Sequence, residues 1–392
     1  MSELRIGFVV PHYWPSVDQH ARVCGQLAAG LAAAGADVTV ITPQHDRRWP
    51  VAAKHRGVNI IRMRKPARDQ HAVKGIGKRR LAVWLKSHAS AFDVVLVSGL
   101  KGAAAAAVRA TRSLKLPVAL RAESAGLSGD CHWQINSRLG QRYKKWCMKA
   151  DALIATGPAV YEELIAAGYP RPRIHLCQSG VELPQIGSDE DIRKARRAIA
   201  DSHPALQVAT GAPFVVSIGP LSSEQNQQLL VDGWPSVLAR FPMAKLWIVG
   251  EGPLLPELQQ RVDQLKLTDS VLLPGSFHEM QELLTAADLL VWPAADAATR
   301  HEQLESLAAA KPIILADTPT SRDLTGDTSA AQFVAGQTSA DWSQAILQLL
   351  SDPQTAAEIG QKARARAVEH FSFSSMIESH LDVLGKVVRD SR

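Results

Sequence analysis

The 392-residue sequence contains only four cysteines, Cys24, Cys131, Cys147 and Cys177, and no two of them form a Cys-x-x-Cys pair. This spacing excludes a disulfide scaffold and a zinc ribbon, and it favours the reduced thiols of a cytosolic protein. No run approaches the roughly 20 apolar residues that a membrane-spanning helix needs. The opening MSELRIGFVV is interrupted too quickly by charge to predict a signal peptide.

Several familiar site motifs are also missing. The sequence has no Walker A motif, no Gly-x-Gly-x-x-Gly after a strand, no His-Glu-x-x-His and no Gly-x-Ser-x-Gly. The formal net charge of +6 is only mildly basic, and it comes without an RNA-binding signature, a recognition-helix pattern or zinc-finger spacing. Nucleic acid is therefore not expected as a partner.

The positive charge is concentrated in the first half of the chain. Between Arg47 and Lys86, thirteen Lys and Arg residues stand against a single acid, Asp69. A second basic run, around residues 138–149, has Trp133 and Trp146 nearby. Such runs are either an ordinary solvated surface or a patch that attracts an anionic acceptor or an anionic membrane, where each basic group contributes roughly 1 kcal/mol. Both interpretations stay open.

Short β-branched apolar runs alternate with amphipathic segments along the first half. Strands are predicted at residues 5–10, 38–42, 59–63, 92–98, 117–122 and 151–155. A helix is predicted at residues 20–34, because Val23, Leu27 and Leu31 share one face and Gly35 is a stop signal. Another is predicted at residues 103–112. This alternation is typical of parallel sheets covered by helices.

Residues 183–213 interrupt the alternation of predicted strands and helices, which resumes at residue 214. Its acidic run, Asp189 to Asp191, is interpreted as solvated charge in a linker that precedes a short basic helix. Strands are predicted at 214–219, 245–250, 271–275, 288–293 and 312–317, and helices at 234–240, 255–265, 280–286, 304–310, 342–350, 352–369 and 374–388. Two similar α/β halves predict two Rossmann-like domains that face each other across a cleft and bind ligands at the carboxyl ends of their strands.

Motifs in both halves carry a resemblance to a known family. The second half contains VSIGPL at 216–221, LWIVGEGP at 246–253, VLLPG at 271–275, AADLLVWP at 286–293 and LESLAAAKPII at 304–314. The first half contains LAAAGADVTVIT at 31–42 and SGVE at 179–182. In this order the motifs resemble those of the family-4 (group 1) glycosyltransferases of the GT-B fold. The resemblance covers nearly the whole chain and implies a last helix that crosses back to the first domain.

The resemblance also implies that the two domains bind different substrates. Residues 1–182, with a returning helix at 372–392, would form an N-terminal acceptor domain, and residues 183–371 a C-terminal nucleotide-sugar domain. In that family a sugar passes from a nucleotide-sugar donor to an acceptor with retention of anomeric configuration, in polysaccharide or glycolipid synthesis. Basic side chains and backbone amides neutralise the leaving diphosphate, so no metal or other cofactor is expected. We expect a cytoplasmic protein, with peripheral attachment to the inner face of the membrane as an open hypothesis.

The candidate site residues combine positions that match the family's motifs with neighbours that could replace its missing groups. The donor-side candidates are three strand-end glycines, one glutamate and one cation, namely Gly219, Gly250, Gly275, Glu305 and Arg300. The family's equivalent of Glu305 binds the nucleotide ribose. The acceptor-side candidates are Trp14, Arg121 and Glu123. No metal ligand is expected, and the catalytic residues are left unassigned.

Several family hallmarks are replaced in this sequence. Where the family has Gly-Gly before the first helix, this sequence has Asp18 and Gln19. Where the family has the Arg and Lys that neutralise the donor phosphates, it has Pro220 and Gln225. Ala297 replaces the first glutamate of the family's pair, and residues 298–300 replace the adjoining Gly-Phe-Gly. Glu123 replaces the histidine of the family's acceptor domain.

These replacements leave two leading functional hypotheses, beside a third in which the protein binds a nucleotide that carries no sugar. Loss of one preorganised stabilising group typically lowers an enzyme's rate about 100- to 1000-fold, so the donor chemistry is expected to suffer. One hypothesis is an active transferase in which Arg300, His301, Arg121 or Arg22 supplies positive charge and Asp296 replaces the missing glutamate. The other is a catalytically silent homologue that acts as a binding or partner subunit.

Overall fold

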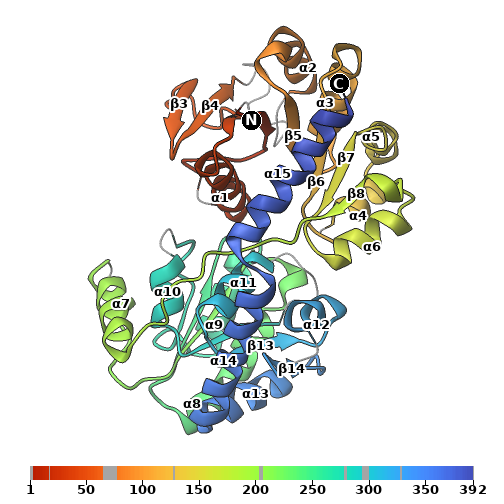
Figure 1. The fold of residues 1–392 in the computed structure, drawn as a ribbon. Helices are drawn as coiled ribbons and strands as arrows, with labels where there is room; N and C mark the ends of the chain where they lie inside the picture. Colours follow the sequence, from red (N-terminus) through yellow and green to blue (C-terminus); the bar gives the residue numbers. More distant parts are fainter. Residues whose placement is uncertain are drawn as a thin grey trace. The chain divides into compact units, whose positions relative to one another are not determined.

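The chain folds into two compact units, each with its own sheet (Figure 1). Unit 1 comprises Met1–Ser179 and Ser374–Arg392, and unit 2 comprises Gly180–Phe373. The structure is a computed structural model that describes residues 3–16, 18–64, 77–126, 129–202, 206–277, 280–293, 300–326 and 329–391. Part of the basic stretch, residues 65–76, and the family positions 296–299 lie outside the described residues.

The unit 1 sheet has eight strands in the order β3-β4-β2-β1-β5-β6-β7-β8. Their bounds are β1 Arg5–Val9, β2 Asp37–Pro43, β3 Ala52–His55, β4 Val58–Met63, β5 Val94–Ser98, β6 Val118–Ala122, β7 Ala152–Ala155 and β8 Ile174–Leu176. All described pairings in it are parallel except that of β3 with β4. The central strands β1, β5, β6 and β7 are almost wholly buried, as expected for a parallel sheet covered on both faces, whereas the edge strand β3 is not buried.

Seven helices of the described chain belong to unit 1. They are α1 Gln19–Ala33, α2 Lys78–Ser87, α3 Gly102–Thr111, α4 Asp130–Asn136, α5 Gly140–Cys147, α6 Pro158–Ala166 and the C-terminal α15 Phe373–Asp390. Asp18 caps α1, because its carboxylate accepts a hydrogen bond from the backbone N–H of Ala21. Since α15 packs within unit 1, the predicted return of the last helix to the first domain is confirmed.

Unit 2 has a six-stranded sheet in the order β11-β10-β9-β12-β13-β14, and its described pairings are all parallel. The strands are β9 Phe214–Ile218, β10 Lys245–Val249, β11 Val271–Leu272, β12 Leu289–Trp292, β13 Ile313–Ala316 and β14 Gln332–Val334. The helices are α7 Asp189–Ser202, α8 Gln228–Arg240, α9 Leu255–Gln264, α10 Met280–Ala286, α11 Arg300–Ala308, α12 Pro319–Thr325, α13 Ser339–Ser351 and α14 Pro353–His370.

Two apolar clusters cover the two faces of the unit 2 sheet. Trp247 and Trp292 lie in one cluster, and Trp234 and Trp342 lie in the other, all four fully buried. Trp292 also donates its indole N–H to the carbonyl of Ile218 at 2.7 Å, which ties the ends of β12 and β9 together. Large aromatic side chains therefore fix the strand ends of this unit.

Both sheets contain the strand order 3-2-1-4-5-6 of a doubly wound fold, as β4-β2-β1-β5-β6-β7 in unit 1 and β11-β10-β9-β12-β13-β14 in unit 2. In such sheets ligands bind at the carboxyl ends of the strands, where the strand order reverses. That point lies between β1 and β5 in unit 1, and between β9 and β12 in unit 2.

Three sequence expectations are corrected by the structure. The acidic run from Asp189 to Asp191 is the first turn of α7, where carboxylates are favoured by the helix dipole, and not part of a linker. Glu305 lies inside α11 and not at a helix start, because that helix already begins at Arg300. The strand predicted at residues 271–275 ends at Leu272. The elements that were not predicted from the sequence are β3, β8, β14, α2, α4, α5, α6 and α12.

None of the described helices combines the length and apolarity required to cross a membrane.

Candidate functional site

Three glycine-rich strand ends meet at one edge of the unit 2 sheet. Gly219 follows β9, Gly250 follows β10, and Gly275 lies shortly after β11. The Gly250 N–H donates to the Gly275 carbonyl at 3.0 Å, and the Gly219 N–H donates to the Val249 carbonyl at 3.0 Å. The structure thus brings the three candidate glycines together beside the point where the strand order reverses.

Gly250 is required by sterics at this edge. Its φ is +149°, and a Cβ atom there would lie 1.9 Å from the Gly219 carbonyl oxygen. Gly252 is equally crowded, because a Cβ on it would lie 2.2 Å from the Leu221 carbonyl oxygen. The glycines therefore allow two loops to touch backbone to backbone, whatever ligand they bind.

The positions expected to carry the family's two cations lie in a turn of this chain that has no Lys or Arg and contains one acid, Glu224. Pro220 accepts a hydrogen bond from the Gln227 side chain at 3.0 Å, and Gln225 is only 3% exposed. Asn226 next to it adopts a φ of +52° and donates its side-chain amide to the Pro293 carbonyl at 3.2 Å. The turn is packed and internally hydrogen-bonded, and residues 219–228 contain no Lys or Arg.

Glu305 and Arg300 both project from α11, where Glu305 lies near a histidine and Arg300 pairs with an aspartate. Glu305 is mostly buried, and its Oε1 lies 3.4 Å from His301 Nε2, one turn earlier. Arg300 donates to Asp323 Oδ2 at 3.0 Å on α12, and its guanidinium lies 5.8 Å from the centroid of the Phe371 ring. Burial lowers the pKa of Arg300, and Asp323 counteracts this effect. The positive charge of Arg300 is thus balanced within unit 2.

On unit 1, Arg121 and Glu123 form a buried ion pair at the end of β6. Arg121 Nη1 donates to Glu123 Oε2, and the Arg121 side chain is only 1% exposed. Burial would raise the pKa of Glu123, but Arg121, His20 and the Ser98 hydroxyl together hold it below its usual value. Two of the three acceptor-side candidates therefore lie together as a charged pair.

Sequence reasoning missed the residues that surround this pair. Ser98, the last residue of β5, donates its hydroxyl to Glu123 Oε1 and lies 2.9 Å from His20 Nε2. Cys24 donates its thiol to the same Ser98 oxygen at 3.6 Å. Burial lowers the pKa of His20, but Cys24 and Glu123 outweigh it and raise the value to about 9.

A usable signal for these residues was present in the helix periodicity. The apolar stripe of α1 contains Leu27 and Leu31, and continuing it backwards by one turn at a time leads to Cys24 and His20. A histidine on a stripe that faces the core needs a polar partner there. His380 on α15 is another buried imidazole of unit 1, and burial lowers its pKa to about 4.

The third acceptor-side candidate, Trp14, belongs to a different group on unit 1. Trp14 is 40% exposed as a residue, and its ring stacks on His55 with ring centroids 4.4 Å apart. Arg62 lies below it, 5.7 Å from the ring centroid, and donates to the Trp14 carbonyl at 2.8 Å. These contacts hold the indole in one orientation with one part open to solvent.

Comparison with known proteins assigns the family. The model described as "Glycosyl transferases group 1" matches residues 199–366, and the model described as "Glycosyl transferase 4-like domain" matches residues 20–180. The chain belongs to the group 1 glycosyltransferases. The predicted family is therefore confirmed, and the two matches follow each other along the chain as the motif order predicted.

Curated relatives of this group 1 glycosyltransferase are distant. Alpha-maltose-1-phosphate synthase of Mycolicibacterium smegmatis is 24% identical over 261 residues, 61% of this chain and 64% of the relative. D-inositol 3-phosphate glycosyltransferase of Nocardia farcinica is 25% identical over 264 residues, 65% of this chain and 56% of the relative. The match thus spans less than two thirds of either relative.

Solved structures confirm the fold of this group 1 glycosyltransferase. HepE of Anabaena, crystallised in complex with UDP and glucose, has a TM-score of 0.77 and 17% identity, and the match covers 98% of this chain and 100% of that chain. The predicted GT-B fold is therefore confirmed. The roles of the individual site residues stay predictions.

Proposed function

We propose that this group 1 glycosyltransferase binds a nucleotide sugar on unit 2 and transfers the sugar to an acceptor bound by unit 1. The observation that carries the proposal is the joined glycine edge of Gly219, Gly250 and Gly275, which starts at β9, the strand next to the reversal of strand order in unit 2. Ligands of doubly wound sheets bind at such an edge. The complex of HepE with UDP and glucose, on the same fold, supports a nucleotide sugar as the ligand.

Each donor-side group has a distinct task in this proposal. Gly219, with a φ of +159°, puts backbone without a side chain at the end of β9, where the diphosphate would approach. Glu305 accepts hydrogen bonds from the ribose hydroxyls, and these charge-assisted bonds are stronger than neutral ones. Transfer retains the anomeric configuration and uses no metal, as in the family. Because Pro220 and Gln225 carry no charge, we expect slow turnover.

On the acceptor side we assign stacking to Trp14. Its indole is held by His55 and Arg62 and keeps an open part, as a platform for a sugar ring requires. The names of the relatives mention maltose 1-phosphate and inositol 3-phosphate, so a phosphorylated or otherwise anionic acceptor in glycolipid or polysaccharide synthesis is the proposed class.

A catalytically silent partner subunit is the second candidate function. It is favoured by the packed turn at Pro220 and Gln225, and by the pairing of Arg300 with Asp323. A silent homologue would keep the fold and the glycine edge but would not release a diphosphate. Both candidate functions include nucleotide-sugar binding, but only the active transferase turns the donor over.

Removal of the Glu305 carboxylate tests the proposed donor site. We expect Glu305→Ala to weaken nucleotide-sugar binding about 10- to 100-fold, because a hydrogen bond to a charged group contributes about 1.5–3 kcal/mol. Isothermal titration calorimetry with UDP-, GDP- and ADP-linked hexoses measures the change. Glu282→Ala, at an exposed position of α10, is the matched control and should bind like the wild type. Equal affinities for wild type and Glu305→Ala would contradict the assignment.

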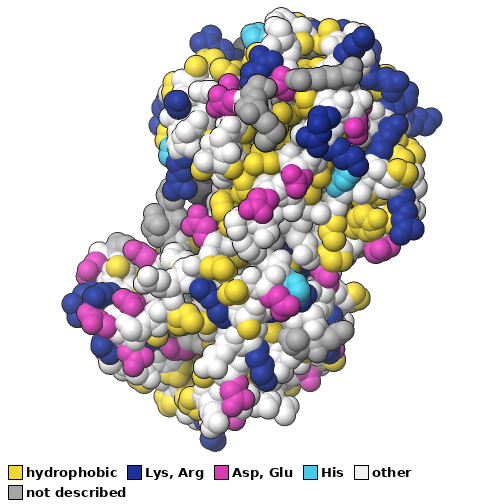
Figure 2. All heavy atoms as spheres, in the orientation of Figure 1, with side chains coloured by type: hydrophobic (Ala, Val, Ile, Leu, Met, Phe, Trp, Pro, Cys, Tyr) yellow, Lys and Arg dark blue, Asp and Glu magenta, His cyan; other side chains and the backbone are white. Residues whose placement is uncertain are grey.

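A basic and aromatic surface of unit 1 is proposed to attach the protein to anionic membranes. Figure 2 shows Lys and Arg side chains gathered on unit 1 in the region of α3 and α5. Lys101 lies 5.6 Å from the Trp133 ring centroid and Lys149 lies 4.7 Å from that of Trp146, so cations and aromatic rings share this surface. Val83 and Ile135 add exposed apolar groups.

Vesicle sedimentation at low salt tests this attachment. The charge reversals Arg79→Glu and Arg142→Glu, on α2 and α5, should together weaken binding to anionic vesicles by on the order of tenfold or more, at about 1 kcal/mol per basic group. Arg193→Glu with Arg197→Glu, on the exposed face of α7, makes the same charge change in unit 2 and should have little effect. Absence of wild-type binding to anionic vesicles would remove the proposal.

A further inference from the structure

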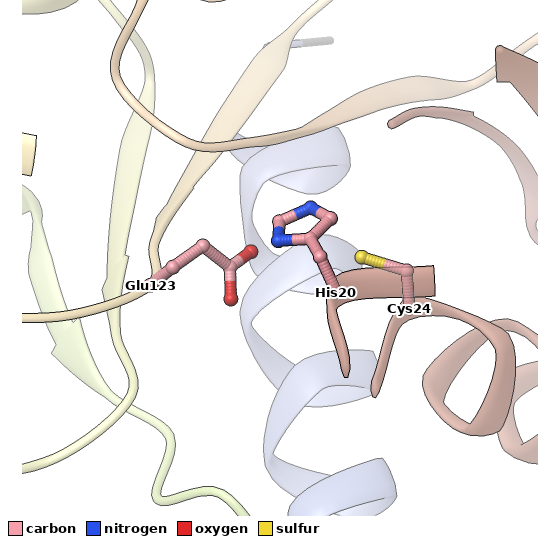
Figure 3. A group of neighbouring side chains, drawn as sticks. All are labelled: His20, Cys24 and Glu123. Atoms are coloured by element: carbon pink, nitrogen blue, oxygen red, sulfur yellow. The ribbon is translucent and has the colours of Figure 1, made fainter. Parts of the chain in front are cut away.

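Three potential metal ligands from two elements of unit 1 converge in the structure. His20 and Cys24 are four residues apart on α1 and so share one face of the helix, and Glu123 follows β6. Figure 3 shows the three side chains pointing toward one another. Their ligand atoms, a ring nitrogen, the thiol sulfur and a carboxylate oxygen, all lie within 4.8 Å of one another. We call this group the His20–Cys24–Glu123 cluster.

Ser98 supplies a fourth donor atom to the same space. Its Oγ lies 2.9 Å from His20 Nε2 and 3.6 Å from Cys24 Sγ, and it donates to Glu123 Oε1. With metal–ligand distances of about 2.0–2.3 Å, the ligand atoms of a tetrahedral zinc site lie about 3–4 Å apart. The four atoms thus need only small shifts to surround one ion.

The outer contacts of the cluster match those of a metal site. Glu123 uses Oε1 inside the cluster, while Oε2 accepts from the buried guanidinium of Arg121. The Glu123 backbone N–H donates to Asp130 Oδ2 at 3.0 Å, and this fixes the loop that carries the carboxylate. Carboxylate ligands of metals are oriented by such outer hydrogen bonds.

The position of the cluster in the fold also favours a ligand. Ser98 ends β5 and α1 follows β1, so the cluster lies at the reversal of strand order in unit 1. Cys24 is fully buried and His20 partly so, on the core-facing stripe of α1, where an imidazole needs a polar partner or a bound ligand.

We infer that His20, Cys24 and Glu123 bind one Zn²⁺ ion, with the Ser98 hydroxyl or a water molecule as the fourth ligand. Nitrogen, thiolate sulfur and carboxylate oxygen are the donor types that zinc takes in proteins. Binding releases the Cys24 thiol proton, and any proton on the ligating His20 nitrogen, to solvent, and it links α1 to the ends of β5 and β6. The ion would serve unit 1 and not the departure of the donor diphosphate, so the inference is independent of the proposed function.

Cobalt substitution tests the ligand set without any activity assay. The full-length protein, freed of metal with a chelator, is expected to bind one equivalent of Co²⁺ and to develop four-coordinate d–d bands with a thiolate-to-cobalt charge-transfer band. One equivalent of Zn²⁺ should abolish both. Cys24→Ser should lose the charge-transfer band, whereas Cys131→Ser, which removes another buried thiol of unit 1, should keep it.

Competition with a chromophoric chelator supplies the second measurement. Arg121→Lys is expected to weaken Zn²⁺ binding about 10- to 100-fold, as for other outer-contact residues, and His20→Ala to weaken it further. Circular dichroism of each metal-free variant shows whether it is folded. A wild-type protein that needs a large excess of Co²⁺ to develop bands, or a charge-transfer band that persists in Cys24→Ser, overturns the inference.

Discussion

The double variant Pro220→Arg/Gln225→Lys is expected to transfer sugar at least about 100-fold faster than the wild type. Both substitutions return a cation to a position where the family neutralises the leaving diphosphate, and one preorganised stabilising group typically changes the rate about 100- to 1000-fold. Residues 219–228 of the present chain contain no Lys or Arg. Initial rates of nucleoside diphosphate release from the nucleotide sugar that the wild type binds best measure the gain.

A charge-matched control separates local from general effects of these cations. Gln260→Arg/Gln264→Lys adds the same charges at exposed positions of α9 in the same unit and should leave the rate unchanged. Because Gln225 is buried, the thermal unfolding of the double variant must be compared with that of the wild type. A folded double variant with the wild-type rate would contradict the view that the missing cations limit this protein.

Removing the Glu123 carboxylate is expected to destabilise unit 1 by about 3–5 kcal/mol, because Glu123→Ala leaves Arg121 buried without its partner. For a unit of this size the loss lowers the melting temperature by roughly 6 to 20 °C in differential scanning calorimetry of the whole chain. Arg121→Met combined with Glu123→Leu should recover most of the loss, since an apolar pair requires no charge compensation.

The exposed pair of Asp46 and Arg48 provides the control for this experiment. Arg48 is 89% exposed, and Asp46→Ala should leave the melting temperature nearly unchanged. A Glu123→Ala protein that melts with the wild type would contradict the role of the buried pair in unit 1.

The same pair predicts a pH dependence. Despite burial, Arg121, His20 and Ser98 keep the pKa of Glu123 below its unfolded value of about 4.3. The resulting stabilisation is fully present above that value and is lost as the pH falls through the folded-state pKa. The difference in melting temperature between wild type and Glu123→Gln should therefore be largest near neutral pH and shrink below about pH 4.

The fold was predictable because its signals are local and repeated. The apolar runs that became β1 and β9 are buried along their length, and the spacing of Val23, Leu27 and Leu31 places α1 within one residue of its observed bounds. Both depend on backbone periodicity, which a single sequence shows directly. The short edge strand β3, with its mixed residues Ala52–His55, carries no such pattern and was missed.

The candidate site was less predictable because tertiary contacts decide it. His301, Glu302 and Gln303 are polar residues that a sequence pattern places in a loop, yet they are buried within α11 and move Glu305 into the middle of that helix. The network of His20, Ser98 and Glu123 joins residues 25 to 78 positions apart, so no local pattern contains it. The partner of Arg300, Asp323, is likewise on another helix.

Hydrogen exchange followed by mass spectrometry, with and without saturating nucleotide sugar, tests the central claim most directly. The account predicts slower exchange in peptides covering residues 219–221 and 250–252 and in α11, which together contain Gly219, Gly250 and Glu305. It predicts this protection for at least one UDP-, GDP- or ADP-linked hexose, and less protection in Glu305→Ala at a ligand concentration that just saturates the wild type. Unchanged exchange at these peptides with every donor, or protection confined to other parts of unit 2, would contradict the claim that this edge binds the donor.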